Sequence, residues 1–343
     1  DLNNIEDLTL GDASVQTFAI TSTDTELEDL TLTANTSASY TGPNNGVGEE
    51  QEALVTPSSD PLNPVDISGS FEAILNVTAG AAADLVIGDG TNAHLNLDGL
   101  EELTLGNNTY NEVYADAALV DLTLGDDSTT YLNGATNLAG VLGAGGDETL
   151  ILDFDTSIEV NFIENIEVGG GDLTVTLDDS QTNDVTTLEI GEDSDVIFAD
   201  LDISGNGGGA DLKTITGDAG YETLTLDVAI LNANMTLVEE VTTAATSDFD
   251  SVDGELEILN VLAGTTTIEA GATGLETVNL AANTEADLTD ATALVTVTGV
   301  AGNDETLTLR SGVTTLTGMT LVENLNALGT AQSYTVTADS ELD

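Results

Sequence analysis

Short runs in which apolar and polar residues alternate recur along this chain, and one six-residue pattern stands out among them. The pattern has apolar residues at its first, fourth and sixth places and a glutamate at its second. Its last three residues alternate with the period of two that is typical of a strand with one buried face. Clear copies cover residues 5–10, 27–32, 100–105, 163–168, 256–261 and 275–280, weaker ones begin at Val238 and Val322, and residues 119–124 repeat the pattern without its glutamate.

The spacing of these copies indicates a repeat protein. The copies that begin at residues 5 and 27, at 238 and 256, and at 256 and 275 are separated by 22, 18 and 19 residues. A period of about 20 residues fits one coil of a solenoid, and Gly, Asn, Asp and Ser form the turns between the runs. We therefore predict an all-β fold, a parallel β-solenoid of irregular repeats, with tandem β-sandwich domains as the alternative.

One segment interrupts the repeats. Residues 41–66 hold all four prolines of the chain, and proline cannot donate a hydrogen bond to a sheet ladder. We interpret this segment as a long loop or linker between an N-terminal strand region, residues 1–40, and a repeat body, residues 67–343. Helical periodicity is weak everywhere, and residues 229–241 are the only candidate for a helix.

The charge of the chain excludes several partners. Asp and Glu number 63 against two basic residues, Lys213 and Arg310, and the net charge is -61. Binding to nucleic acid or to an anionic membrane surface requires Lys and Arg, so neither is expected. Cations are the natural partners, above all Ca²⁺, which prefers carboxylate and carbonyl oxygens. Adaptation to a salty environment is the alternative explanation of the acidity.

The absence of cysteine and of long apolar stretches adds to this interpretation. A protein outside the cell without disulfides must be held by its repeats, by ions or by assembly. No apolar stretch reaches the roughly 18 residues of a membrane span. The sequence begins at Asp1 without a signal-peptide pattern, which fits a mature chain, a fragment, or export without an N-terminal signal.

Some of the repeats resemble a known family. Residues 274–280, Gly-Leu-Glu-Thr-Val-Asn-Leu, resemble phrases of the RTX-type S-layer proteins of Gram-negative bacteria and cyanobacteria. Residues 145–150 and 301–307 resemble halves of the RTX nonapeptide, but the halves never stand in tandem. The resemblance implies a calcium-binding surface coat that is exported by type I secretion, and the broken motifs favour a looser parallel solenoid over a regular calcium-filled β-roll.

A second family shares part of the pattern. Residues 100–108 fit the core of a leucine-rich repeat, as do residues 27–35 and, with one substitution, residues 275–283. Leucine-rich repeats keep a steady period and place a helix or tight turn on their outer side. The irregular period and the Gly- and Thr-rich spacers of this chain disfavour them.

Calcium ligands are expected where Asp and Asn follow or precede strands in flexible turns, because several oxygens must converge there. None of these turns has the twelve-residue loop of an EF-hand. The simpler interpretation of each residue is a solvated turn position. The predicted metal ligands are Asp89, Asp126, Asp127, Asp147, Asp172, Asp193, Asp195, Asp200, Asp202, Asp218, Asn303 and Asp304.

The sequence predicts that this chain is not an enzyme. Among 63 acidic residues, carboxylate pairs must occur by chance, and the Arg, Lys, His and aromatic residues that usually hold sugars are scarce. His94 alternates with apolar neighbours and is predicted to point outward from a strand. A polysaccharide-active enzyme is the least favoured alternative.

The functional prediction is an extracellular structural protein of the cell surface. We expect it to assemble with itself into a layer, sheath or filament, with Ca²⁺ bridging carboxylates. If the motif glutamates stack at one position of the solenoid, they repel each other unless a cation lies between coils. A secreted adhesin or other ligand-binding solenoid is the main alternative. An ice-binding solenoid would need aligned threonine rows, and rows such as residues 265–267 are scattered along the sequence.

Overall fold

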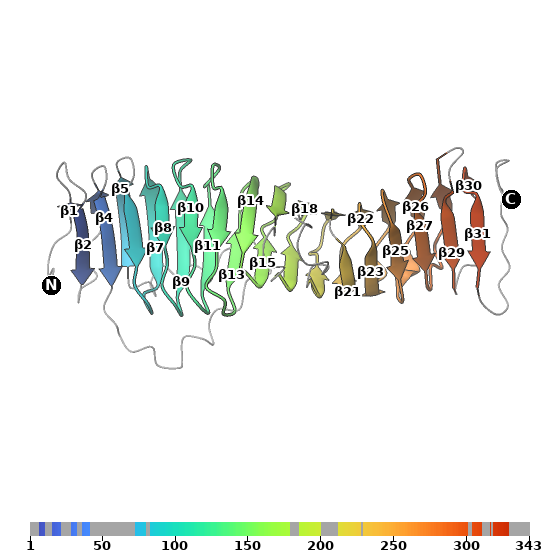
Figure 1. The fold of residues 1–343 in the computed structure, drawn as a ribbon, viewed down its shortest axis with the longest axis horizontal. Coiled ribbons are helices and arrows are strands. Elements are labelled where there is room, and N and C mark those ends of the chain that lie inside the picture. The colour runs from blue at the N-terminus through green and yellow to red at the C-terminus, as the bar shows by residue number, and fades with distance from the viewer. Residues whose placement is uncertain are drawn as a thin grey trace. The chain divides into compact units, whose positions relative to one another are not determined.

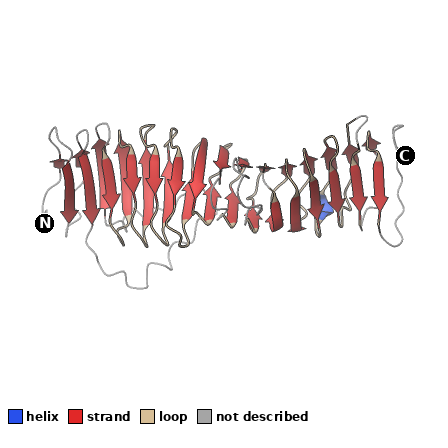
Figure 2. Cartoon of the chain, viewed as in Figure 1, coloured by secondary structure: helices blue, strands red, loops and turns tan. Residues whose placement is uncertain are grey.

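In a computed structural model the chain is an all-β protein whose strands form a parallel β-solenoid (Figures 1 and 2). The structure describes residues 7–10, 16–21, 29–32, 36–41, 73–79, 83–178, 185–199, 212–227, 229–300, 304–310, 316 and 318–328. Within these residues the only helical element is η1 (Ala272–Gly274), a single 3-10 turn that is blue in Figure 2. The chain divides into two units, Asp1–Leu173 and Thr174–Asp343, which share one architecture.

In the first unit the odd-numbered strands form one parallel sheet and the even-numbered strands form the other, so the chain changes sheet after every strand. The odd-numbered sheet contains, in order, β1 (Asp7–Leu10), β3 (Asp29–Leu32), β5 (Ala73–Ala79), β7 (Ala93–Asp98), β9 (Tyr110–Ala115), β11 (Thr129–Asn133), β13 (Thr149–Leu152) and β15 (Asn165–Val168). The even-numbered sheet contains β2 (Gln16–Thr21), β4 (Thr36–Thr41), β6 (Asp84–Ile87), β8 (Glu102–Thr104), β10 (Asp121–Thr123), β12 (Gly140–Leu142) and β14 (Thr156–Asn161).

The second unit alternates between two parallel sheets in the same way. Its odd-numbered strands are β17 (Thr187–Ile190), β19 (Thr214–Thr216), β21 (Ile230–Thr236), β23 (Ser247–Val252), β25 (Thr265–Ile268), β27 (Glu285–Leu288), β29 (Thr306–Leu309) and β31 (Asn324–Ala327). Its even-numbered strands are β16 (Thr174–Asp178), β18 (Asp195–Ala199), β20 (Thr223–Leu226), β22 (Glu240–Thr243), β24 (Ile258–Val261), β26 (Thr277–Leu280), β28 (Thr296–Thr298) and β30 (Gly318–Thr320). Parallel pairing distinguishes this fold from the β-sandwich alternative, whose sheets are antiparallel.

The register of the strands confirms that the repeat is irregular in length. Glu102 pairs with Asp121 and Asp121 pairs with Gly140, so these two successive coils are equally long. Elsewhere Asp195 pairs with Thr223, which makes one long coil, and Thr223 pairs with Glu240, which makes the next coil much shorter. The strands remain in register, so the turns absorb the differences in length.

The core is a stack of aliphatic side chains from successive coils. Leu85, Leu103, Leu122, Val141 and Val160 are register partners in the even-numbered sheet of the first unit, and all of them are buried. Their strand neighbours face outward and are polar or acidic in most coils, as the two-residue period of a strand requires. A narrow core of Leu, Ile and Val can close without the aromatic bulk that this chain lacks.

The repeated six-residue pattern takes the predicted orientation. In the copy at residues 275–280, Leu275, Val278 and Leu280 are buried, while Glu276 is exposed. The three apolar places of the pattern therefore supply one strand and its approach to the core, which confirms the interpretation of the pattern as a solenoid coil.

The candidate helix at residues 229–241 was wrong, because this segment contains strand β21. The strand has a bulge, because Ile230 pairs with Ser247 and Ala233 pairs with Phe249, so that three steps along β21 match two along β23. Because a bulge shifts the alternation of faces, the buried residues Ile230 and Ala233 lie three positions apart, the spacing of a helix.

Strands on the two sides of the proline-rich segment are neighbours in the same sheets. Asp29 of β3 pairs with Asn76 of β5, and Ser37 of β4 pairs with Asp84 of β6. The first two coils therefore pair directly with the coils that follow residue 72. Beyond Thr41, the predicted linker at residues 41–66 lies outside the described residues.

Candidate functional sites in the turns and on the sheet faces

Several predicted calcium ligands of the first unit lie in turns that stack on each other. Asp89 Oδ1 accepts a hydrogen bond from the backbone N–H of Asn107 in the next coil (2.9 Å), and Asn107 Oδ1 accepts one from Asp126 (2.7 Å). Asp127 Oδ1 accepts the N–H of Asp147 in the same manner (3.2 Å). These side chains bind each turn to the next and satisfy backbone donors that no strand ladder reaches.

The same turns contain residues in the left-handed region. The φ angle is 67° at Gly90, 55° at Asn108 and 53° at Asp127. Glycine adopts this region without strain, and Asn and Asp tolerate it better than other residues do. Asp and Asn therefore have a structural reason to occupy these turns, whether or not they bind a cation.

The remaining predicted ligands that the structure describes either accept single hydrogen bonds or are exposed. Asp193 Oδ1 accepts the N–H of Tyr221 (3.1 Å), Asp195 accepts a hydrogen bond from the hydroxyl of Thr223, and Asp218 accepts one within its own turn. Asp172 and Asp304 are exposed, and Asp200, Asp202 and Asn303 lie outside the described residues.

These positions do not form a chelating group. Among the described residues, no three or more Asp, Glu or His side chains are placed to hold one metal ion. Calcium takes about six to eight oxygen ligands, and a single exposed carboxylate supplies one or two. Calcium binding by the turn residues therefore stays a prediction.

The even-numbered sheet of the first unit carries a column of carboxylates on its outer face. Asp84, Glu102 and Asp121 begin β6, β8 and β10 and are register partners in successive coils. The pKa of Glu102 is raised, mainly by the negative charge of Asp84 and then by desolvation and the charges of Asp121 and Glu101. Desolvation and Glu101 raise the pKa of Asp84.

This column was not predicted from the sequence. Its signal is an acidic residue directly before an inward leucine, as in Asp84-Leu85, Glu102-Leu103 and Asp121-Leu122. The signal becomes meaningful only when the strand register stacks these positions. Neighbouring strands lie about 4.8 Å apart, at which spacing two carboxylates in water repel by about 1 kcal/mol.

The motif glutamates also stack, as the repeat pattern suggested. Glu240 of β22, Ile258 of β24 and Thr277 of β26 are register partners. The residues directly before them are Glu239, Glu257 and Glu276. Glu257 and Glu276 are exposed, and Glu239 is buried. The second unit therefore has its own line of carboxylates along one end of a sheet.

The outer face of the odd-numbered sheet of the first unit carries the single histidine and a group of tyrosines. His94 Nδ1 lies 2.8 Å from Glu112 Oε2. The ring of Tyr114 is 5.3 Å from that of His94 and 5.9 Å from that of Tyr131, between centroids. The Tyr131 hydroxyl donates a hydrogen bond to the carboxylate of Asp153. His94 is thus part of an outward polar and aromatic surface, as its place in the strand predicted.

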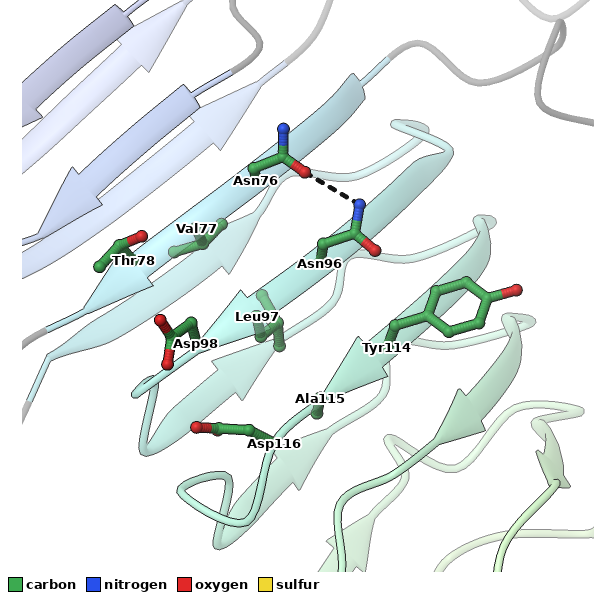
Figure 3. A pocket seen from close by; sticks show the side chains of 9 residues that line it. All are labelled: Asn76, Val77, Thr78, Asn96, Leu97, Asp98, Tyr114, Ala115 and Asp116. Carbon is green, nitrogen blue, oxygen red and sulfur yellow. Dashed lines mark hydrogen bonds between the residues drawn. The ribbon is translucent and has the colours of Figure 1, made fainter.

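A shallow groove of about 370 Å³ adjoins this surface (Figure 3). Asn96 Nδ2 donates a hydrogen bond to Asn76 Oδ1 within it (3.0 Å), and the ring of Tyr114 extends from the next strand. Amides, a hydroxyl, carboxylates and one aromatic ring are groups that can bind a polar ligand with hydroxyls. The lining residues are Asn76, Val77, Thr78, Asn96, Leu97, Asp98, Tyr114, Ala115 and Asp116.

Both basic residues make contacts within the chain. Arg310 donates hydrogen bonds from Nε (2.6 Å) and Nη2 to the carboxylate of Asp287, which is buried. Lys213 Nζ donates to the carbonyl oxygen of Leu231 (3.1 Å). The chain has no other Lys or Arg with which to bind an anion.

Comparisons with models of known protein families, with curated proteins and with solved structures find no match to this chain. In the described part of the chain, no helix has the length and apolar character needed to cross a membrane. The geometry and charge of the solenoid therefore carry the functional inference.

Proposed function

We propose that this chain is a structural subunit that assembles with copies of itself into a layer, sheath or filament on the outside of a cell. Ca²⁺ bridges carboxylates of neighbouring subunits in this assembly, as in the RTX-type S-layer proteins that its repeats resemble. The observation that carries the proposal is the outward column of Asp84, Glu102 and Asp121, in register on a parallel sheet.

The column supports bridging between molecules and not a closed site within one molecule. The fold holds these carboxylates at the spacing of the strands and so maintains their repulsion in every molecule. A hard divalent cation relieves that repulsion and has coordination positions left for oxygens of a second subunit. The described residues alone provide no set of three acidic ligands around one point.

The exclusion of other partners agrees with this function. A surface with a net charge of -61 repels nucleic acids, anionic membranes and its own copies. Self-assembly of such a chain requires cations that neutralise the facing surfaces. Monovalent salt screens this repulsion over a Debye length of about 8 Å but does not connect two carboxylates.

The test is assembly measured by light scattering and electron microscopy at fixed ionic strength. We expect about 1 mM calcium, in the affinity range of extracellular calcium modules, to produce ordered sheets or fibres that dissolve in EGTA. Magnesium at the same concentration is the control, because it keeps its water and demands a stricter geometry. A protein that stays a folded monomer under all of these conditions refutes the proposal and favours salt adaptation.

A matched pair of variants locates the effect. Replacing Glu102 by Gln and Asp121 by Asn removes two charges from the column and should raise the calcium concentration needed for assembly. The control is Asp250→Asn, which removes a charge from an exposed position of β23 in the second unit. Equal shifts per charge in both proteins would show that general charge, and not the column, governs assembly.

A second candidate function, a ligand-binding solenoid, is favoured by the groove beside Tyr114. The groove has hydrogen-bonding side chains and an aromatic ring on a flat sheet face, and these features suit a neutral glycan. Binding to a panel of immobilised glycans should then be lost in Tyr114→Ala. Binding should be retained in Tyr221→Ala, which removes an exposed tyrosine of the second unit.

A further inference from the structure

One sheet surface of the second unit carries no charged side chain. The strands β24, β26, β28 and β30 are successive neighbours in the even-numbered sheet, and none of their residues is Asp, Glu, Lys or Arg. In a chain with 63 acidic residues, an uncharged surface of this extent needs a physical reason. We call the outward side of these four strands the neutral face.

The neutral face consists of two columns of outward side chains. In register order they are Ile258, Thr277, Thr296 and Gly318 in one column and Asn260, Asn279, Thr298 and Thr320 in the other. The strand residues between the columns, such as Val278 and Val297, are buried in the core. Because most of the outward side chains are short, no bulky group on this face keeps a second sheet at a distance.

The other three sheets of the two units differ from the neutral face in charge. Each of them presents carboxylates on its outer side, for example exposed Asp98 of β7, Glu102 of β8 and Asp250 of β23. Like charges that face each other across an interface oppose association. Among the described sheets, the neutral face is therefore where a second acidic surface can approach at the lowest electrostatic cost.

The amides of the neutral face are already hydrogen-bonded along the stack of coils. Asn279 Nδ2 donates to Asn260 Oδ1 (2.8 Å). Asn260 Nδ2 donates in turn to Thr242 Oγ1 (3.2 Å) and to Glu240 Oε1 (2.8 Å) of the preceding coil. Covering a polar group that keeps its hydrogen bond costs much less than covering one that loses it to desolvation. Another surface can therefore cover these amides without leaving them unpaired.

Exposed aliphatic side chains border the neutral face. Leu262 directly follows β24, Val295 directly precedes β28, and Val300 lies two residues beyond the end of β28. The acidic border is confined to the start of two strands, where Glu257 and Glu276 precede β24 and β26. Covering the face would also remove these aliphatic groups from water, which favours association.

These properties favour a second copy of this chain as the partner. Two molecules with a net charge of -61 repel each other wherever their acidic surfaces meet, and two neutral faces place no carboxylates opposite each other across their columns. Sheets pack face to face about 10 Å apart, which short side chains on both surfaces allow. A glycan is less favoured, because the four strands hold no aromatic ring and the amide of Asn260 is already bonded within the sheet.

The size of the neutral face limits the strength of such a contact. Four strands about 4.8 Å apart, each with four residues that rise about 3.3 Å, cover about 250 Å². Two such faces bury about 500 Å² together, which is less than the roughly 1,000 Å² of a specific stable interface. A single contact is therefore weak, and it becomes effective in an array where other contacts hold the same subunits.

We propose that two copies of this chain pack through their neutral faces, sheet against sheet, about a twofold axis. The inference rests on the proposed self-assembly and adds to it a contact that requires no bridging cation. A twofold contact uses the same surface on both subunits, so alone it stops at a dimer. Together with calcium bridges between acidic surfaces it gives each subunit a second kind of contact, and the assembly can then continue beyond a pair.

Distances between spin labels test the contact in the absence of calcium. The chain has no cysteine, so Thr298→Cys provides a single labelling site on the neutral face. The matched control is Thr267→Cys in β25, a half-buried outward threonine of the other sheet whose register partners are Asp248 and Asp287. The buffer contains EGTA and about 1 M NaCl, which shortens the Debye length to about 3 Å and so screens the remaining repulsion.

Electron paramagnetic resonance should then detect pairs of labels at Thr298→Cys in concentrated protein. Two faces about 10 Å apart and about 19 Å wide place the labelled positions within about 25 Å of each other in any register. The labelled Thr267→Cys protein should show no such population of short distances, because the face that carries it is acidic.

A charge placed on the neutral face tests its part in the array. Thr298→Glu should raise the calcium concentration needed for assembly about tenfold, because every contact then brings like charges together away from bulk water. Thr267→Glu adds the same charge to the acidic face and should have a much smaller effect. If Thr298→Glu fails to fold, Asn279→Asp makes the same test with almost no change of shape. Its control is Asn326→Asp in β31, whose amide also donates to a threonine of the preceding coil.

The outcomes separate this inference from the proposed function. Equal label distances in the two cysteine variants, or equal effects of the charge on the two faces, would overturn the inference and leave calcium-driven assembly in place. Short distances at Thr298→Cys in a protein that forms no array with calcium would support the neutral contact and refute that assembly. Glycan binding that Thr298→Glu abolishes, without short distances at Thr298→Cys, would assign the face to a ligand and overturn the inference.

Discussion

Leu259 provides a direct test of the stacked core. It lies in β24, is 0 % exposed, and is the register partner of Val241 in β22 and of Val278 in β26. Leu262 follows the same strand and is 55 % exposed. Alanine at Leu259 removes a buried side chain and leaves a cavity between two coils, and alanine at Leu262 removes the same atoms from water.

The expected magnitudes differ severalfold. The lost transfer free energy of a buried leucine is about 1.5–3 kcal/mol, and the cavity brings the total for Leu259→Ala to about 2–5 kcal/mol. The change for Leu262→Ala should be within about 0.5 kcal/mol. Urea unfolding followed by circular dichroism measures both variants under the same conditions, and an unchanged m-value shows that stability alone has changed.

Hydrogen exchange adds a spatial readout. In a solenoid each coil contacts only its neighbours, so protection in Leu259→Ala should fall mainly in β22, β24 and β26. Equal losses of stability in the two variants, or a loss below about 1 kcal/mol at Leu259, would refute the inward orientation assigned to it. Loss of protection spread evenly over the chain would refute the nearest-neighbour coupling of the coils.

Two further predictions concern the turns and the tyrosines. Gly125→Ala places a Cβ atom against the backbone of Gly106 in the preceding coil and should lower the free energy of unfolding by about 1–3 kcal/mol. Gly318→Ala is the control, because the nearest atoms would be 3.6 Å from its Cβ, and it should change the free energy of unfolding by less than about 0.5 kcal/mol. Urea unfolding that ranks the two variants equally would contradict the close stacking of the turns. Desolvation and neighbouring carboxylates raise the pKa of Tyr110 and of Tyr221 from 10.0 to about 12. Phenolate absorbance from both side chains should therefore appear near pH 12 in the folded protein. The stability of the fold should fall as pH rises from 10 to 12, because the unfolded chain releases these protons first. Titration of every tyrosine near pH 10 in the folded protein would show that these side chains are free in water.

The pattern of the chain was sufficient to predict a coil but not its length. The copy at residues 275–280 could be oriented from its period alone, because a strand with one buried face must alternate. The coil from Asp195 to Thr223 is much longer than the one that follows it. Its Gly-rich composition does not predict that strands β18 and β20 pair directly. Turn length carries little energetic penalty, so it varies without a periodic signal.

Local irregularity also misled the periodic argument. The bulge in β21 moved Ile230 and Ala233 onto the same side at a helical spacing, and residues 229–241 were interpreted as a weak helix. Pairing with β23 determines the conformation there. A bulge depends on the partner strand and leaves little trace in the sequence of one strand.

The candidate sites divide along the same line. Turn aspartates such as Asp89 and Asp127 could be found in the sequence because Gly, Asp and Asn mark turns, although their hydrogen bonds to the next coil could not. The outward column that contains Glu102 depends on register, because acidic residues in separate repeats are only neighbours when the coils stack.

By itself the sequence determined the class of fold and the inward faces of its strands, because the period of a strand acts locally. Only the tertiary structure decided which carboxyls meet. Glu148 and Glu164 are ordinary acidic residues in the sequence, and their separation of 16 residues differs from the 17 of Glu222 and Glu239 and the 18 of Glu305 and Glu323. The coil register brings the two glutamates of each pair together, so their contact is a property of the stacked coils and not of either residue.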